Sequence, residues 1–222
     1  MSTRYNPSIV RDNIVQYLDA ANTKSYSGSG TTWTDMSSRN RDGTLTNGPT
    51  FSTDNLGCFN FDGSNDYVNL NYVFTQASSA NSYTVVVAAK LSSTSTSRRQ
   101  IFACDNGGFD WGFGSGDGGN FIIFTGSGST QGRTQDLNWH IFTAQWSSSF
   151  GTRLWIDDEL DINTSTISYD SSISGQTNLG RNPGFTYEIF HGKIALCLTY
   201  DKALTETEIK QNFNALRGRF EI

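Results

Sequence analysis

Short strand-like segments recur along the whole chain, and clusters of Gly, Ser, Asn and Asp separate them. The segments are rich in Val, Ile, Phe, Tyr and Trp, which suit a pleated, half-buried surface. They span residues 13–19, 57–61, 66–70, 83–91, 99–104, 109–114, 120–125, 138–146, 152–157, 176–180 and 192–200. No helices alternate with them, which argues against a parallel sheet built from strand–helix–strand units. The pattern predicts an all-β fold of antiparallel strands, either a sandwich or a barrel.

Two of these segments are apolar at consecutive positions instead of alternating. They are residues 85–89 and 121–124. A strand that is apolar on both sides needs cover on both faces. We therefore expect both segments to lie in the middle of a sheet.

A single helix is predicted near the C-terminus. Thr205 and Glu208 have the spacing of a capping box, in which each side chain bonds the backbone N–H of the other residue. The apolar positions that follow have helical spacing and form one stripe of Ile209, Phe213 and Leu216. Gly218 is expected to end the helix, because glycine readily adopts the left-handed conformation found at helix ends. We expect this helix to pack on the β-sheets.

The length of the chain indicates one domain. A chain of 222 residues suits a single all-β domain. The expected strands and helix occupy residues 13–218, which leaves an N-terminal arm at 1–12 and a C-terminal tail at 219–222. The arm lacks the apolar core of a secretory signal, and no stretch is apolar over the length of a membrane span. We therefore expect a soluble protein that does not use that export route.

Charge and cysteine content narrow the function classes. The net charge is −5, and an acidic surface repels phosphate backbones, so we expect no nucleic-acid partner. The three cysteines, Cys58, Cys104 and Cys197, have no paired spacing. We expect them to be buried free thiols in a protein made in a reducing cytoplasm. No Cys-x-x-Cys pair occurs, so a zinc site is not expected.

The stretch GCFNFDGSNDYVNL, residues 57–70, suggests either a metal-binding loop or a tight turn. An EF-hand loop that begins at Asp62 needs glycine at its sixth position and glutamate at its twelfth, but Tyr67 and Val73 stand there. A hairpin explains the stretch better, because Gly63 supplies a positive φ and Asp62 can bond nearby backbone. The two strands of this predicted hairpin carry the apolar residues Phe59, Phe61, Val68 and Leu70.

The order of several motifs resembles a known family. The motifs are FNFDGSNDYVNL, YTVVVAAKL, NWHIFTAQW, GTRLWIDDEL and NLGRN, followed by FHGKIALCLTYDKALTETEIKQNF. Over about residues 13–217 they resemble a laminin-G-like domain of the concanavalin A-like lectin/glucanase superfamily. The resemblance implies a jelly-roll sandwich of two antiparallel sheets, one of them often concave. Residues 15–51 resemble the version of this domain in structural proteins of tailed phages, cyanophages in particular.

Glycosidases occur in that superfamily, so catalytic groups must be considered. Glycoside hydrolysis usually needs two carboxylates that flank the scissile bond. The stretch WIDDELD offers four acids: Asp157, Asp158, Glu159 and Asp161. The resembled family has a strand–turn–strand here, which puts the acids at an exposed hairpin tip, and the glucanase pattern Glu-x-Asp-x-x-Glu is absent. We therefore expect no catalytic residues and no enzyme activity.

Other catalytic and cofactor motifs are also missing. The sequence has no Gly-x-Ser-x-Gly pentapeptide, and so no nucleophile elbow. The glycine-rich stretch GSGST, residues 126–130, lacks the lysine of a phosphate-binding loop. Of the two histidines, His140 and His191, we expect His140 to be a structural residue at a strand end.

Carbohydrate recognition is the remaining possibility. Aromatic rings stack on the apolar faces of sugars, and polar side chains bind their hydroxyl groups. Residues 105–120, DNGGFDWGFGSGDGGN, combine both kinds of group. The candidate glycan-binding residues are Phe109, Asp110, Trp111 and Asn120 in that stretch, Arg181, Asn182 and Tyr187 beyond it, and more weakly Trp33. The alternative is that the aromatic residues of 105–120 belong to the core and the acids to turns.

Neither a metal nor another cofactor is required by these motifs. Calcium is nevertheless common at loop rims in the resembled superfamily. The side chains that could supply oxygen ligands are Asp105, Asp110 and Asp117, although their spacing matches no known calcium loop.

These expectations combine into a non-enzymatic virion structural protein with a lectin-like fold, made in the host cytoplasm. A capsid decoration, knob or short-fibre subunit fits best, because the chain lacks the heptads or β-helix repeats of a fibre shaft. The expected partners are other capsid or tail proteins, further copies of the chain and host-surface glycans, with no nucleic acid and no membrane. Two alternatives remain: a carbohydrate-binding module of a cellular protein, and a glycoside hydrolase.

Overall fold

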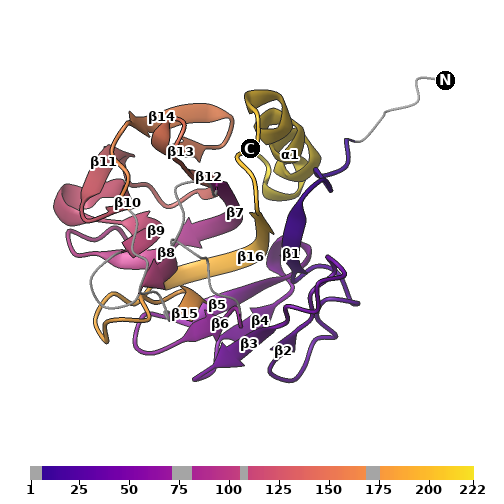
Figure 1. Cartoon of the computed structure of the whole chain (residues 1–222). Coiled ribbons are helices and arrows are strands. Elements are labelled where there is room, and N and C mark those ends of the chain that lie inside the picture. The colour runs from indigo at the N-terminus through magenta and orange to yellow at the C-terminus, as the bar shows by residue number, and fades with distance from the viewer. Residues whose placement is uncertain (1–6, 72–81, 106–109, 169–175) are drawn as a thin grey trace.

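A computed structural model describes residues 7–71, 82–105, 110–168 and 176–222 (Figure 1). The side chains of Asp110 and Asp117 are outside this description. Two antiparallel sheets stack face to face, each with eight strands in the described part of the chain. This is the predicted sandwich, and the fold is a concanavalin A-like jelly roll with one C-terminal helix.

Sheet A holds the long central strands of the molecule. Its strands in spatial order are β14 (Glu159–Thr164), β13 (Gly151–Ile156), β12 (Trp139–Ser147), β7 (Ser82–Leu91), β16 (His191–Tyr200), β5 (Cys58–Asp62) and β4 (Thr50–Ser52). β1 (Ile14–Asp19) pairs with the far half of β16, beyond the part that pairs with β5. The predicted apolar strand at 85–89 is therefore central, with β12 on one side and β16 on the other.

Sheet B forms the second layer. Its strands in spatial order are β11 (Ser129–Thr134), β10 (Asn120–Gly126), β9 (Asp110–Ser115), β8 (Arg99–Asp105), β15 (Gln176–Leu179), β6 (Tyr67–Asn69), β3 (Gly43–Thr46) and β2 (Thr32–Trp33). Two short 3-10 turns, η1 (Asp54–Leu56) and η2 (Asp117–Gly119), connect strands at the rims.

The inner core lies between the two sheets and is rich in aromatic side chains. Alternate residues of facing strands point inward, as the two-residue period of a strand requires. Among the buried side chains of this core are Trp33, Phe59, Phe61, Phe102, Trp111, Phe113, Phe121, Phe142 and Trp146. The Trp111 and Trp146 rings stack at 5.8 Å between centroids. All three cysteines are buried and unbridged, as predicted.

A second core lies between the outer face of sheet A and helix α1 (Glu206–Phe220), and Figure 1 shows the helix lying against this sheet. Ile209, Phe213 and Leu216 form one buried cluster with outward side chains of β7, β12 and β16, so the predicted stripe faces the sheet. The capping box of Thr205 and Glu208 forms as predicted. α1 is therefore what covers the second apolar face of β7. In the described residues, no helix has both the length and the apolar character needed to cross a membrane.

The predicted end of the helix is wrong by almost one turn. Gly218 lies inside α1, and Glu221 adopts the left-handed conformation with its N–H donating to Arg217 O. The helix is prolonged because Phe220 packs on Trp139 of β12, with ring centroids 4.9 Å apart. Tertiary packing thus outweighs the preference of glycine for the helix end.

Both terminal segments pack against the rest of the fold. Ile9 and Val10 are buried in the second core. Val10 N donates to Asn212 Oδ1 at 2.8 Å, and Tyr200 Oη donates to Val10 O at 3.0 Å. At the other end of the chain, Arg219 Nη1 lies 2.7 Å from Asp19 Oδ1 and forms an ion pair with it.

The predicted hairpin at residues 57–70 is wrong in its pairing but right in its turn. Asp62 Oδ1 accepts the backbone N–H of Ser64 at 2.8 Å, and Gly63 has φ +78°. However, β5 belongs to sheet A and β6 to sheet B, so the turn carries the chain from one layer to the other. The sequence pattern of inward apolar residues on both strands is the same whether the strands pair in one sheet or lie in opposite sheets. In both cases each strand turns one face toward the core.

Four strands escape the sequence prediction: β2, β3, β4 and β11. They are short or rich in Thr, Ser and Gly, and most lie at sheet edges. Edge strands bury little apolar surface, so their sequences carry a weak signal.

Candidate functional site: a pocket on the outer face of sheet B

The outer face of sheet B carries a row of side chains that crosses the strands. The strand register places seven positions side by side: Thr44, Asn69, Asn178, Ala103, Gly112, Phe124 and Ser129. Their neighbours Leu45, Val68 and Leu179 belong to the inner core, so the row faces outward. Ala103 and Gly112 at the centre of the row are its smallest residues, so the surface of the sheet is lowest there.

A loop lies over this low centre. We call residues 181–188 the strap; it follows β15 and returns to β16. Glu188, which is 3% exposed, accepts Gln100 Nε2 at 3.0 Å and Asn182 Nδ2 at 2.9 Å. A Cβ added to Gly184 would collide with the Asp105 carboxylate, so the strap backbone lies directly against β8. Buried hydrogen bonds therefore hold the strap to the sheet.

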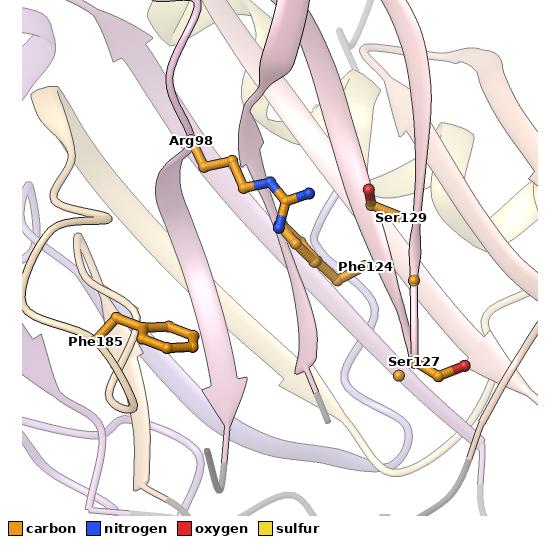
Figure 2. Close-up of a pocket in the computed structure, with 7 residues that line it drawn as sticks. Arg98, Phe124, Ser127, Ser129 and Phe185 are labelled. Carbon is orange, nitrogen blue, oxygen red and sulfur yellow. The ribbon is translucent and has the colours of Figure 1, made fainter. Parts of the chain in front are cut away.

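Beyond the strap a pocket of about 250 Å³ opens on the β10–β11 side (Figure 2). Its lining residues are Arg98, Phe124, Gly126, Ser127, Gly128, Ser129 and Phe185. The Arg98 guanidinium lies over the Phe124 ring, 5.3 Å from its centroid, and Phe124 is 3% exposed. Figure 2 shows Phe185 extending from the strap toward Arg98 and Phe124. The accessible aromatic surface of the pocket thus belongs mainly to the half-buried Phe185.

The chemistry of the pocket suits a polyhydroxylated ligand. Ser127 and Ser129 are exposed and present hydroxyl groups that both donate and accept hydrogen bonds. The Arg98 guanidinium contributes further donors, and the Phe185 ring offers an apolar face. Among the described residues that line the pocket, none is acidic.

The predicted sugar-binding residues have separate locations. Trp111 is 1% exposed, and its Nε1 donates to Ser168 O at 3.1 Å, so it belongs to the core. Trp33 is fully buried as well. Phe109 and the Asp110 side chain lie outside the described residues. Asn120 bonds Gln131 Oε1 at 3.1 Å, at the end of β10 remote from the pocket.

The other three candidates all lie on the strap. Arg181 stacks on the Tyr67 ring at 5.2 Å, and Tyr187 is 69% exposed. Asn182 is fully buried and positions the loop, since Gly184 N donates to its Oδ1 at 2.8 Å. The sequence analysis thus pointed to the strap but not to Phe185. The sequence analysis also noted the stretch GSGST, residues 126–130, because it is rich in glycine. It lacks the phosphate-binding lysine, and its first four residues line the pocket.

The acids of WIDDELD are engaged in structural contacts. The predicted strand–turn–strand is present, with Asp157 and Asp158 in the turn between β13 and β14. Asp157 Oδ2 contacts His140 Nδ1 at 2.8 Å, while Glu159 and Asp161 each pair with Arg133 at 3.0 Å.

His140 lies between two carboxylates at the rim of the sandwich. Its Nε2 contacts Asp136 at 3.1 Å, opposite the contact of Nδ1 with Asp157. Burial lowers the pKa of His140, but the hydrogen bonds and charges of Asp157 and Asp136 outweigh burial and raise it above 6.5. The residue is structural, at the start of β12, as predicted.

The described residues do not assemble an acidic ligand set for calcium. Nowhere among them do three His, Cys, Asp or Glu side chains converge as a metal site requires. Asp105 is buried against the strap, and it is the sole member of the three candidate aspartates whose side chain is described.

Comparison with known proteins identifies the family. A family model described as the concanavalin A-like lectin/glucanases superfamily, of the laminin-G-like type, matches residues 62–210. The chain belongs to this superfamily. No curated protein gives a significant match.

Solved structures share the fold at low sequence identity. A Trypanosoma rangeli sialidase in complex with sialic acid matches with a TM-score of 0.70 and 12% identity, over 95% of this chain and 34% of the sialidase. The chain thus spans about a third of that enzyme. Domain 4 of AbnA, a GH43 extracellular arabinanase from Geobacillus stearothermophilus, in complex with arabinotriose, matches with a TM-score of 0.68 and 14% identity. That match covers 90% of this chain and 98% of domain 4.

A third similar structure is the binding domain of Paraclostridial Mosquitocidal Protein 1. It has a TM-score of 0.66 and 13% identity, over 92% of this chain and 52% of that one. Identities this low establish the shared fold, while function has to come from the site.

Proposed function

We propose that this chain is a non-enzymatic, lectin-like structural protein of a tailed-phage virion that binds host-surface glycans through the strap pocket. The observation that carries the glycan part is the pocket itself, where the Phe185 ring, two serines and the Arg98 guanidinium line one cavity on the outer face of sheet B. The superfamily supports this use of the fold. The virion part rests on the resemblance of residues 15–51 to phage structural proteins.

The contacts of the acidic residues support a role without catalysis. Hydrolysis needs a pair of carboxylates facing a substrate. Of the four acids in WIDDELD, three are bound to His140 or Arg133, and Asp158 is exposed in the turn. The part of the pocket lining that the structure describes contains no carboxylate.

Glycan binding is tested with the purified protein on a glycan array, followed by calorimetry with the strongest ligand. Phe185→Ala removes the accessible ring and is expected to weaken binding roughly tenfold, about 1.4 kcal/mol, as loss of a central aromatic contact does. Leu56→Ala is the matched control, because Leu56 is 75% exposed and remote from the pocket lining. Equal affinity of the two variants would rule out this pocket as the glycan site.

The virion role has its own experiment. Mass spectrometry of purified phage particles that encode this chain is expected to find it in stoichiometric amount. Its absence from the particles would overturn the virion role and leave glycan binding standing. Sustained hydrolysis of a polysaccharide panel, lost in an Asp157, Glu159 and Asp161 triple variant, would instead establish a glycosidase.

The match to domain 4 of the arabinanase favours one alternative, a carbohydrate-binding module of a cellular protein. Under that alternative the same pocket binds a glycan, but the chain is absent from virions and occurs joined to an enzyme or an export signal. The particle analysis therefore separates the two.

A further inference from the structure

We infer that the strap pocket recognises the end of a glycan chain or a short branch, and not the interior of a long polysaccharide. This inference rests on the proposed function and specifies the class of ligand. It follows from the way the strap divides the outer face of sheet B.

Without the strap, this face would offer a continuous track for a polymer. The row from Thr44 to Ser129 crosses seven strands that lie about 4.8 Å apart, so it spans on the order of 30 Å. The low centre at Ala103 and Gly112 would form the floor of a groove across the sheet.

The strap fills that floor with buried side chains. Gln100 and Asn182 are fully buried and Glu188 is 3% exposed, so the centre of the row is closed to a ligand. Glu188 accepts from Asn182 within the strap and from Gln100 of β8, so the bond to Gln100, together with the close approach of Gly184 to Asp105, ties the strap to β8. Moving the strap aside would expose the buried Glu188 carboxylate and take this acceptor from the Gln100 amide, so the strap is a fixed barrier.

The pocket that remains is closed on its strap side by Phe185. Its volume of about 250 Å³ lies just below the usual range of about 300 to 1,000 Å³ for small-molecule sites. A sugar that stacks on Phe185 and bonds Ser127 and Ser129 has the strap on one side and the β10–β11 turn on another. Because the strap closes the centre of the row, a glycan that lies across the strands cannot continue past Phe185 and has its end there.

The test measures how the affinity and the stoichiometry of binding depend on the length of the glycan and on the number of its chain ends. Linear arabinan, galactan, glucan and polysialic acid are each used as oligosaccharides of increasing length and as the polymer, and binding is measured by calorimetry. End recognition predicts an affinity per chain end that is independent of length, and one protein bound per end. Binding that increases in proportion to the total number of sugars would overturn this inference but leave glycan binding intact. Binding to none of the series would overturn both.

A single methyl group tests the role of the strap. Gly184→Ala is expected to weaken end binding several-fold, because the new Cβ collides with Asp105 and displaces Phe185. Gly218→Ala is the matched control, since a Cβ there meets no atom within 4 Å. Thermal unfolding of both variants verifies that they are folded. Unchanged affinity in folded Gly184→Ala would show that the strap does not shape the site.

Discussion

At the residue scale, the environment of a side chain decides its role more than its chemical type does. Trp111 and Phe185 are both aromatic and lie in polar, glycine-rich stretches. Trp111 stacks on Trp146 in the inner core, whereas Phe185 extends into the pocket. The sequence stretch around Trp111 has the composition of a sugar site, but alternation along β9 turns the ring inward. Composition alone does not separate these two outcomes.

His140 provides a prediction at this scale. Its pKa is raised in the folded protein, so its contribution to stability is fully present below pH 6.5 and is lost as the pH rises through the folded pKa. The free energy of unfolding of the wild type should therefore fall relative to that of His140→Gln as the pH rises above 6.5 and through the folded pKa. Urea unfolding at a series of pH values measures this difference.

The control for this experiment is a variant that leaves every titratable group in place. Leu56→Ala should keep the pH dependence of the wild type, because Leu56 is exposed and its side chain carries no titratable group. Parallel curves for the wild type and His140→Gln would contradict the assignment of the ion pairs.

At the scale of the elements, local signals locate α1 and packing sets its length. The capping box fixes the start of the helix, and the predicted stripe identifies the buried face. The helix end was mispredicted, because the contact of Phe220 with Trp139 joins residues 81 positions apart (220 − 139). A local pattern carries no information about such a contact.

The cap itself is a testable contribution. Thr205→Ala removes the acceptor of Glu208 N and should lower the free energy of unfolding by about 1 kcal/mol. Thr207 lies two residues further into the helix and is exposed. Thr207→Ala should be neutral or slightly stabilising, since alanine has the higher helix propensity. Equilibrium urea unfolding compares the two variants, and equal losses would argue against the cap.

At the scale of the whole molecule, the edges of the two sheets are joined as well as their faces. Arg133 on β11 of sheet B pairs with Glu159 and Asp161 on β14 of sheet A. Asp161 Oδ2 also accepts the backbone N–H of Arg133 at 3.0 Å. The side chain of Asp161 is 9% exposed, so this edge is closed by a nearly buried carboxylate.

Removal of this link should weaken the sandwich. Asp161→Ala leaves the Arg133 N–H without its acceptor and should lower the free energy of unfolding by about 1 to 3 kcal/mol. Glu159→Ala should change it by less than about 1 kcal/mol, because Glu159 is 73% exposed and its pairing is screened by solvent. Thermal or urea unfolding measures both, and the reverse order would refute this account of the edge.

The sequence by itself determined the all-β class, the positions of the main strands, the turn at Asp62 to Asn65 and the capped helix, because alternation, turn chemistry and capping are local. It also determined which face of a strand is buried. Only the tertiary structure decided which sheet each strand joins, as β5 and β6 show, and where the strap crosses sheet B. Those outcomes depend on pairing and contacts between distant residues, and an inward-facing residue satisfies the same burial requirement in either sheet.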